Sequence, residues 1–397
     1  MRALIGVLCM LVWSCSGAGV SPDAPDVPNA PDAPDDPTLI DVDESGLETA
    51  ASLQRRLHEV TPDEAEDYAQ RIVPVLLRRS LRETELERLA VGGMALPELL
   101  AEWSEEDGVQ DAARDMISTL LAASGIRDGT DLNLPGNLAA QLVRDDAPWT
   151  DLITADYCVD GAGERSECDT GAPYVAGILT TRAFMAGNES RYNLRRARTL
   201  VRRFVCVDYP IDSELQPRID RELLIPMFQA TSAADQTEDA APAGFGNGLA
   251  CYACHGQFSA HAQLFVRYDE EGHYREDATG LQLPDGELGV SEVEGLFTSH
   301  FQDPARASSE QTQVLGQEVF SLVEAAEVVA ESPRYVPCAI RHFLAYGFDL
   351  AESEVTAIDD ASVAEITRDA GESPSLPALM RAAFAHPDVI RAALGTP

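Results

Sequence analysis

The chain contains the sequence Cys251-Tyr252-Ala253-Cys254-His255, which is the C-x-x-C-H pattern of covalent haem attachment. Two thiols separated by two residues can form thioethers with the two vinyl groups of one porphyrin. The histidine that follows then lies beneath the iron and can supply an axial imidazole. The pattern therefore predicts one covalently bound haem c, with Cys251 and Cys254 holding the porphyrin and His255 ligating the iron.

Three other interpretations compete with haem for these residues. A structural zinc site needs four ligands, commonly supplied as two pairs, and the chain has no second C-x-x-C pair. His261 could join His255, but this spacing matches no known zinc pattern. A thioredoxin-like redox pair is expected in a βαβ context, which the surrounding pattern does not predict. The last alternative is a chance occurrence or a site that has lost its haem.

The sequence leaves the sixth iron ligand open. A methionine in this position usually gives a higher potential than a histidine. His261 lies six residues after His255, so one continuous helix would keep it on the proximal side of the ring. The candidates are Met185, Met227, Met380, His261, His273 and His300, and an open sixth position is the further alternative.

Charge and composition exclude several functions. The 397 residues carry 67 acidic and 29 basic side chains, which gives a net charge of -38. So acidic a chain is not expected to bind nucleic acid, or to bind anionic lipid through a basic patch. Every basic residue is arginine, which excludes the Schiff-base, P-loop and kinase chemistries that depend on lysine.

The N-terminal sequence predicts an exported lipoprotein. Residues 1–14 form a signal peptide with one positive charge and a short apolar run. Residues 11–15 read Leu-Val-Trp-Ser-Cys and resemble a bacterial lipobox, which marks Cys15 for lipidation. Plain secretion with cleavage after Ala18 is the alternative. The acidic, proline-rich residues 15–45 form an extended tether. We therefore expect the chain in the periplasm or cell envelope, anchored to a membrane by its N-terminal lipid. Export favours the haem interpretation, because haem c is attached outside the bacterial cytoplasm.

Four cysteines remain outside the leader and the haem motif, an even number in an oxidising compartment. Cys158 and Cys168 bracket a polar loop, so a local disulfide between them is favoured. Cys206 would then pair with Cys338, although four cysteines allow three connectivities. Buried free thiols are the alternative.

The pattern outside the tether is mainly α-helical. Thr61-Pro62-Asp63-Glu64 is a capping box with proline at the first helical position. A helix over 109–124 has one apolar face and is expected to end at Gly125. Pro284-Asp285-Gly286 is a turn signal that predicts a small β-hairpin within 266–290. Further helices are expected at 137–144, 149–155, 174–186, 190–205, 291–299, 309–331, 334–347, 360–368 and 375–394.

Composition shifts divide the chain into successive parts. The signal peptide and tether are followed by a helical domain over 46–235, a haem region over 236–350 and a C-terminal helical module over 351–397. The fold class is thus mainly α, multi-helical, with a haem region that contains a small β-hairpin.

Two further features are interpreted as structural. His342 flanks the apolar stripe of the 334–347 helix and is expected to border the core and not to bind metal. The 190–205 helix carries the only concentration of basic residues, which favours a solvated face of salt bridges. A docking surface for an acidic partner, or for haem propionates, is the alternative. Its arginines are Arg191, Arg195, Arg196, Arg198, Arg202 and Arg203.

Several segments occur in an order that is specific when they are taken together. They are Arg78-Arg79-Ser80-Leu81 with Glu85 and Leu86; Pro148-Trp149 with Leu152–Thr154 and Tyr157; Ala176–Thr181 with Ala183-Phe184; the arginine-rich helix ending at Cys206; Cys251–His255; Asp269, Gly272, Tyr274 and Arg275; Cys338 with Tyr346-Gly347; and Ser375–Phe384. In this order they resemble the large exported cytochrome-c-like proteins of planctomycetes and myxobacteria, which are built from modules of unknown function.

The resemblance runs from about residue 61 to the end of the chain and implies a mostly helical haem c protein. It makes the haem region, 236–350, cytochrome-c-like, but it supplies no reaction. The family usually carries Asp-Pro and then Gly-Phe shortly after the haem histidine, where this chain has Ser259-Ala260-His261-Ala262. The immediate surroundings of the haem are therefore expected to differ.

The expected function is single-electron transfer by an exported, lipid-anchored monohaem protein whose redox partner is unknown. Arg275 is a candidate partner for a haem propionate, and a surface salt bridge is its simpler interpretation. The alternatives are a peroxidase-like haem enzyme with an open distal site, and a surface interaction lipoprotein in which C-x-x-C-H is structural. An electron carrier is favoured over a catalyst.

Overall fold

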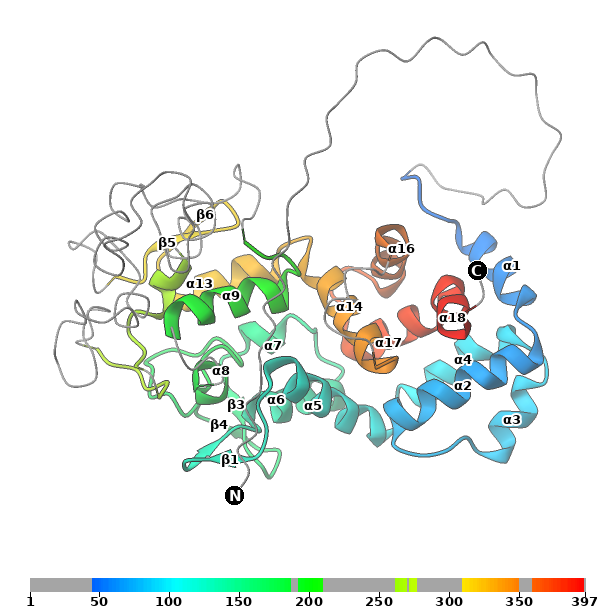
Figure 1. Ribbon diagram of the computed structural model, residues 1–397, viewed down its shortest axis with the longest axis horizontal. Helices are drawn as coiled ribbons and strands as arrows, with labels where there is room; N and C mark the ends of the chain where they lie inside the picture. Colours follow the sequence, from blue (N-terminus) through cyan, green and yellow to red (C-terminus); the bar gives the residue numbers. More distant parts are fainter. Residues whose placement is uncertain are drawn as a thin grey trace, which may run out of the picture. The chain divides into compact units, whose positions relative to one another are not determined.

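The computed structural model describes residues 45–186, 192–209, 261–269, 271–276, 309–349 and 359–395 (Figure 1). All of these residues belong to the unit Asp41–Pro397. The predicted signal peptide, the tether up to residue 44 and the haem motif lie outside them. The predicted helix over 291–299 and the Pro284-Asp285-Gly286 turn also lie outside the described residues.

The described part of the chain is mainly helical, which confirms the predicted fold class at that level. Its α-helices up to residue 204 are α1 (Ala50–Glu59), α2 (Pro62–Leu77), α3 (Glu83–Leu89), α4 (Leu96–Trp103), α5 (Asp107–Leu121), α6 (Leu134–Arg144), α7 (Asp151–Thr154), α8 (Arg182–Ala186) and α9 (Tyr192–Phe204). Later helices are α13 (Leu322–Ala330), α14 (Tyr335–Gly347), α16 (Asp360–Ala370), α17 (Leu376–Phe384) and α18 (Pro387–Leu394), and the turns η1 (Gly93–Ala95) and η2 (Gln263–Phe265) are 3₁₀ helices.

Short antiparallel hairpins interrupt the helices. Within the described residues β1 (Ile126–Arg127) pairs with β2 (Thr130–Asp131), β3 (Cys158–Val159) with β4 (Arg165–Ser166), and β5 (Thr312–Val314) with β6 (Gln317–Val319). None of these pairs extends into a larger sheet in the part of the chain that is described. The core is therefore made by helix packing.

Helix α2 begins as the sequence predicts. Thr61 Oγ1 accepts a hydrogen bond from Glu64 N at 3.3 Å, and Glu64 Oε2 accepts one from Thr61 N at 2.9 Å. Pro62 occupies the first helical position, where its missing N–H costs nothing. The helix ends at Leu77 because Arg78 adopts the left-handed conformation, with φ of 56°.

Helix α5 differs from its predicted limits. It begins at Asp107 and ends at Leu121, because Ala122 takes the left-handed conformation and its N–H bonds the carbonyls of Ser118 and Thr119. The expected C-cap, Gly125, lies three residues later in the turn before β1. The predicted apolar face is confirmed: Val109, Ala112, Ala113, Met116, Ile117 and Leu121 are buried.

Three other predicted helices are wrong in part. The first half of the 309–331 prediction is the β5–β6 hairpin, whose turn residues Leu315 and Gly316 both have positive φ. Two such residues form the tight turn that fits the twist of a hairpin. The 174–186 prediction is helical only over α8. The 375–394 prediction is two helices, because Pro387 starts a new one.

Of the predicted 266–290 hairpin, the described residues contain one antiparallel bridge, between Tyr268 and Tyr274.

The two ends of the described chain share one hydrophobic core. Helix α17 packs against α4, and α18 packs against α1 and α2. Tyr68 on α2 is fully buried, and its Oη donates a hydrogen bond to the carbonyl of Phe384 at 2.9 Å. The segment 359–395, which composition separates as a C-terminal module, is thus part of the packing of the first helices.

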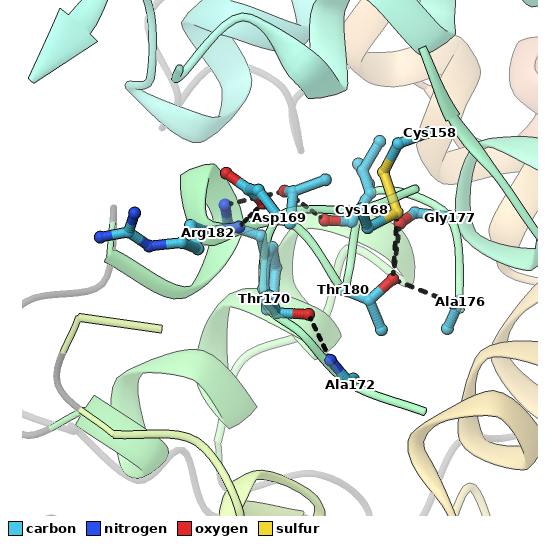
Figure 2. Close-up of a disulfide and its surroundings, with 12 residues drawn as sticks. Cys158, Cys168, Asp169, Thr170, Ala172, Ala176, Gly177, Thr180 and Arg182 are labelled. Carbon is cyan, nitrogen blue, oxygen red and sulfur yellow. Dashed lines mark hydrogen bonds between the residues drawn. A yellow bond between two sulfur atoms is a disulfide. The ribbon is translucent and has the colours of Figure 1, made fainter. Parts of the chain in front are cut away.

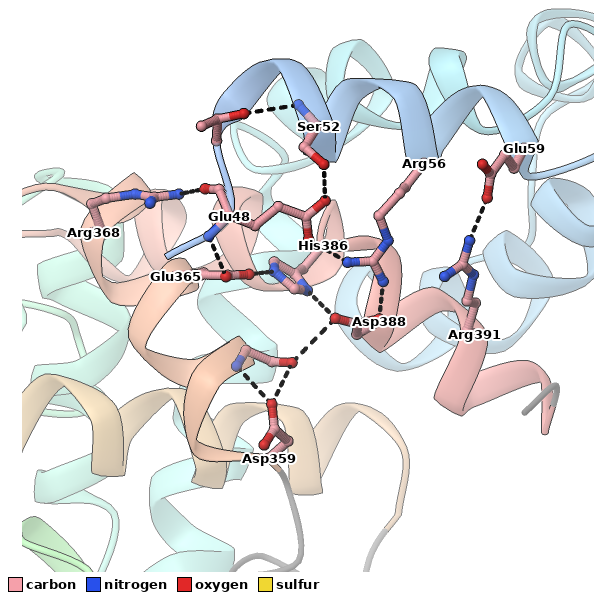
Figure 3. A network of polar contacts seen from close by, with 12 residues as sticks. Glu48, Ser52, Arg56, Glu59, Asp359, Glu365, Arg368, His386, Asp388 and Arg391 are labelled. Atoms are coloured by element: carbon pink, nitrogen blue, oxygen red, sulfur yellow. Dashed lines mark hydrogen bonds and ion pairs between the residues drawn. The ribbon is translucent and has the colours of Figure 1, made fainter. Parts of the chain in front are cut away.

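A network of buried polar groups fastens the start of α1 to α16 and α18 (Figure 3). The main-chain N–H of Glu48 donates to Glu365 Oε1 at 2.7 Å, and Glu365 Oε2 lies 3.0 Å from His386 Nε2. Arg56 pairs with both Glu48 and Asp388. Such a network costs little only when nearly every member is paired.

Among the described residues, no helix combines the length and the apolar composition needed to cross a membrane.

The close approach of α5 to α2 depends on a glycine. A Cβ at Gly108 would lie 2.5 Å from the carbonyl oxygen of Leu77, well inside van der Waals contact. The contacting atoms belong to the backbone, which cannot rotate away. An added methyl group must therefore separate the two helices.

Gly108→Ala is expected to lower the free energy of unfolding by about 1–3 kcal/mol, because it overpacks this contact. Helix propensity alone predicts that the substitution raises the free energy of unfolding, since alanine is the better helix former. Gly161→Ala is the matched control, because nothing lies within 4 Å of the Cβ added there. Chemical denaturation followed by circular dichroism measures both variants. Equal stability of Gly108→Ala and wild type would contradict the packing.

A buried carboxylate organises the turn between α2 and α3. Glu85 is 5% exposed and accepts hydrogen bonds from Arg79 Nη1 at 2.8 Å, from Arg82 N at 2.7 Å and from Trp103 Nε1 at 2.8 Å. Burial alone would raise the pKa of Glu85, but these hydrogen bonds outweigh it and lower the pKa from 4.5 to about 2.

In the Glu85→Gln variant, the free energy of unfolding is expected to fall less steeply than in the wild type as the pH is lowered. Because the folded pKa is depressed, the carboxylate contributes stability that is present above pH 4.5 and is lost as the pH falls towards about 2. The contribution is at most about 3 kcal/mol. The exposed Glu83 on the same helix provides the control, Glu83→Gln. Denaturation at a series of pH values tests this, and a Glu85→Gln protein with the wild-type acid dependence would refute it.

Candidate functional site

The residues that define the haem motif, Cys251, Cys254 and His255, lie outside the described residues, as do Cys15, Met227 and His300. The described part of the candidate site consists of the segments on either side of residues 210–260, which contain the motif. These are α9 with the residues up to 209, and the segment from 261 to 276.

The two described ends that flank the motif touch each other. Tyr209 Oη is hydrogen-bonded to His261 Nδ1, and the centroids of the two rings are 5.6 Å apart. Residues 210–260 thus begin and end at one point of the fold. The pairing joins the two described segments that precede and follow residues 210–260.

His261 is a buried, neutral side chain. It is 1% exposed, and burial lowers its pKa to about 4. Its Nδ1 is hydrogen-bonded to Tyr209, whereas its buried Nε2 has no well-aligned partner in the described part of the chain. A backbone hydrogen bond to Gln313 nevertheless opposes the effect of burial on the pKa, so the ring is held by neighbours within the described fold.

The residues after His261 are held in the core. Leu264 and Phe265 of η2 are fully buried, and the Phe265 ring lies 6.1 Å from that of Phe184 on α8. η2 also packs against α9 and α13. The chain that returns from the haem motif is therefore anchored by apolar contacts.

Arg196 joins the segments on both sides of the motif. Its guanidinium is fully buried and donates to the carbonyls of Met185 at 3.1 Å, Tyr268 at 3.1 Å and Asp269 at 2.6 Å. It also donates to Asn193 Oδ1 at 3.0 Å. These acceptors compensate the desolvation of the cation.

The other arginines of α9 differ from Arg196. Arg198 is exposed and pairs with Asp208, to which Arg202 is also close, at 3.9 Å. The predicted solvated face of salt bridges is therefore correct for these two residues and wrong for Arg196, which the sequence pattern cannot tell from its neighbours. Arg191 lies outside the described residues.

Asp269 closes a compact turn. Its Oδ1 accepts hydrogen bonds from the main-chain N–H groups of Glu271 at 3.0 Å and His273 at 2.8 Å. Gly272 has φ of +82°, and a Cβ there would lie 2.6 Å from Met185 Cβ. The Asp-x-x-Gly-x-Tyr-Arg pattern is thus the sequence of a turn packed against α8.

Arg275, the candidate propionate partner, is paired within that turn. Its Nε donates to Asp269 Oδ2 at 2.8 Å, and its side chain is 58% exposed. This is the surface salt bridge that the sequence offers as the simpler interpretation.

Tyrosines hold the same turn from a second side. Tyr274 makes edge-on contacts with Tyr174 and Tyr268, at 5.9 and 5.5 Å between centroids. Tyr174 Oη donates to the carboxylate of Glu310 at 2.9 Å, and burial raises the pKa of that carboxyl.

The candidate sixth ligands that are described lie in different settings. Met185 on α8 and Met380 on α17 are fully buried in the hydrophobic core. His273 is partly exposed, with Nε2 at 3.7 Å from Glu271 Oε2. His261, described above, is buried and hydrogen-bonded to Tyr209.

The structure pairs the remaining cysteines as the sequence favours. Cys158 is bonded to Cys168 across β3 and β4, and Cys206 is bonded to Cys338. Around the first disulfide, Thr180 Oγ1 lies 3.8 Å from Cys168 Sγ and accepts a hydrogen bond from Ala176 N at 3.1 Å (Figure 2).

The second disulfide has a histidine beside it. His342 Nε2 lies 3.6 Å from Cys206 Sγ, and the ligand atoms of Cys206, Cys338 and His342 all lie within 4.8 Å of one another. This is the sole group of its kind in the residues that the structure describes. Because the two sulfurs are bonded to each other, neither offers a thiolate to a metal.

The sequence interpretation of His342 as a border residue missed this neighbourhood. Cys338 and His342 are four residues apart on α14 and therefore share one helix face. This spacing is the local sequence signal that the two side chains lie close together. Cys206, which completes the group, comes from 132 residues earlier in the chain.

No family model matches the chain, and no curated protein or solved structure is significantly similar to it.

Arg196→Met is expected to lower the free energy of unfolding by about 3–5 kcal/mol, because it leaves buried carbonyls without donors and removes the link between α9 and the 268–269 turn. Hydrogen exchange of residues 262–276 should also accelerate. Arg198→Met, on the same helix but exposed, should change stability by less than about 1 kcal/mol. Similar losses in the two variants, measured by chemical denaturation, would show that Arg196 does not hold the segments together.

Proposed function

We propose that this chain is an exported, lipid-anchored haem c protein that carries single electrons. The observation that carries the proposal is the sequence Cys251-Tyr252-Ala253-Cys254-His255. Cys251 and Cys254 hold the porphyrin as thioethers, and His255 is the axial ligand of the iron. Bound haem c would exchange one electron reversibly with a redox partner protein.

The described residues support the proposal because both segments that flank the motif are held in the core. His255 is six residues from His261, so its Cα lies within about 22 Å of the His261 Cα, even if the intervening chain is fully extended. Arg196, η2 and the Tyr209–His261 pair hold the described segments on either side of residues 210–260 in the core.

The residues around the motif suit a bound prosthetic group. The buried Nε2 of His261 has no well-aligned partner among the described residues, and haem propionates are hydrogen-bond acceptors. Arg275 is the cation of this segment proposed to bind a propionate, in exchange for or in addition to its pairing with Asp269. We further propose that residues 236–350 form a cytochrome-c-like haem region with a small hairpin, as in the family that the chain resembles.

Location follows from the leader. Cys15 is proposed to carry the lipid, and residues 15–45 to act as the tether that keeps the folded part away from the membrane. The protein would then act in the periplasm or cell envelope, where haem c is attached. The net charge of -38 favours a basic redox partner and excludes nucleic acid as a partner.

Expression in cells that attach haem c tests the proposal. The intact mass of the purified protein is expected to exceed that of the processed polypeptide by one haem, and the reduced protein to show a c-type absorption spectrum. The double variant Cys251→Ala, Cys254→Ala should lose the covalent haem. Cys158→Ala, Cys168→Ala, which removes another cysteine pair, should keep it.

Two results would contradict the proposal. A wild-type mass without haem, from cells that load a control cytochrome, would remove its basis. Rapid binding of carbon monoxide to the reduced protein would show an open coordination position and would favour a haem enzyme over a six-coordinate electron carrier.

A further inference from the structure

Cys206 and Cys338 form a disulfide with an imidazole at hydrogen-bonding distance. The bond joins Cys206, two residues after the end of α9, to Cys338 near the start of α14, and His342 follows Cys338 by one helical turn. His342 Nε2 lies 3.6 Å from Cys206 Sγ. His342 also forms a hydrogen bond with the backbone of Arg203, so the fold fixes the imidazole beside the sulfur.

We propose that Cys206–Cys338 is a redox-active disulfide that exchanges electrons with a dithiol partner, and that His342 transfers the proton at Cys206. The proposal does not rest on haem binding. It adds a two-electron thiol centre to this chain.

His342 is a neutral proton relay. Burial of the ring, and then the nearby cation of Arg203, lower the pKa of His342 to about 4, although a backbone hydrogen bond with Arg203 acts in the other direction. The ring is therefore neutral near pH 7 and takes up a proton only transiently before it passes to solvent. A neutral imidazole beside a cysteine is the arrangement that activates thiols in nucleophilic catalysis.

The two sulfurs differ in their accessibility. Cys206 is partly exposed, whereas Cys338 is 1% exposed. An incoming thiolate can thus attack Cys206, while Cys338 is the buried leaving group. The asymmetry assigns the mixed disulfide to Cys206, next to His342.

The backbone at Cys206 is also unusual. Its φ is +53°, in the left-handed region that costs a non-glycine residue about 1 kcal/mol or more. Such conformations persist only where the surroundings enforce them, and they are concentrated at functional sites.

The exchange balances as follows. A partner thiol passes its proton through His342 to solvent and attacks Cys206 Sγ, which forms a mixed disulfide and breaks the bond to Cys338. Cys338 leaves with the electron pair and takes a proton from solvent. The second thiol of the partner, after losing its proton to solvent, then attacks the partner's sulfur of the mixed disulfide and releases Cys206, which takes a proton from solvent through His342. The partner dithiol is oxidised to a disulfide, and Cys206 and Cys338 are reduced to thiols.

The other disulfide is a built-in control. Cys158 is 1% exposed and Cys168 is partly exposed, so this bond matches Cys206–Cys338 in burial. The hydroxyl of Thr180 lies 3.8 Å from Cys168 Sγ, where Cys206 has an imidazole. The two bonds therefore differ in the histidine and in the left-handed backbone at Cys206.

Reduction of the folded, full-length protein by dithiothreitol tests the proposal. Samples are quenched with acid, alkylated and analysed by peptide mass spectrometry, which reports each disulfide separately. Cys206–Cys338 is expected to be reduced at least about tenfold faster than Cys158–Cys168. His342→Gln should slow the first reaction at least about tenfold and leave the second unchanged. His273→Gln, which changes a partly exposed histidine elsewhere, should alter neither rate.

Two outcomes overturn the proposal. One is equal reduction of the two disulfides, or reduction only when the protein unfolds; this comparison needs no variant and holds even if His342→Gln fails to fold. The other is an unchanged rate at Cys206–Cys338 in a folded His342→Gln protein, as judged by its circular dichroism.

Discussion

A buried guanidinium constrains the centre of this structure. Taking the Arg196 cation out of water costs several kcal/mol unless its donors are paired, and its acceptors come from Met185, Asn193 and the 268–269 turn. The fold is stable there only if α8, α9 and the turn meet at one point. Residues 210–260, with the C-x-x-C-H motif, connect two of these segments. The described segments on either side of the motif are thus brought together by the need to pair one charge.

Local patterns in the sequence predicted much of the helical structure. The Thr61 capping box, the apolar face of α5 and the α14 boundaries depend on residues that are close in the chain. The favoured disulfide connectivity agrees with the structure, because one pair brackets a short loop and leaves a single partner for the other. The resemblance segments also acquire physical roles: Arg79 pairs with Glu85, and Gly272 lets its turn approach Met185.

What the sequence could not predict depends on contacts between distant segments. Nothing local separates Arg196 from Arg198, because burial is decided by the return of residues 268–269. In the β5–β6 turn, Leu315 has a positive φ, a conformation that leucine rarely adopts. A leucine at this position therefore does not indicate a turn. His342 gained its neighbour Cys206 only through folding, so its apolar surroundings on α14 indicated a core residue.

We propose two kinds of redox group for one helical body: a haem c bound through Cys251, Cys254 and His255, and a thiol pair at Cys206 and Cys338. A redox titration of the haem-loaded protein, followed by visible absorption, tests whether the chain carries single electrons. We expect one reversible step that fits transfer of a single electron. Haem absorption that does not respond reversibly to the applied potential would contradict it.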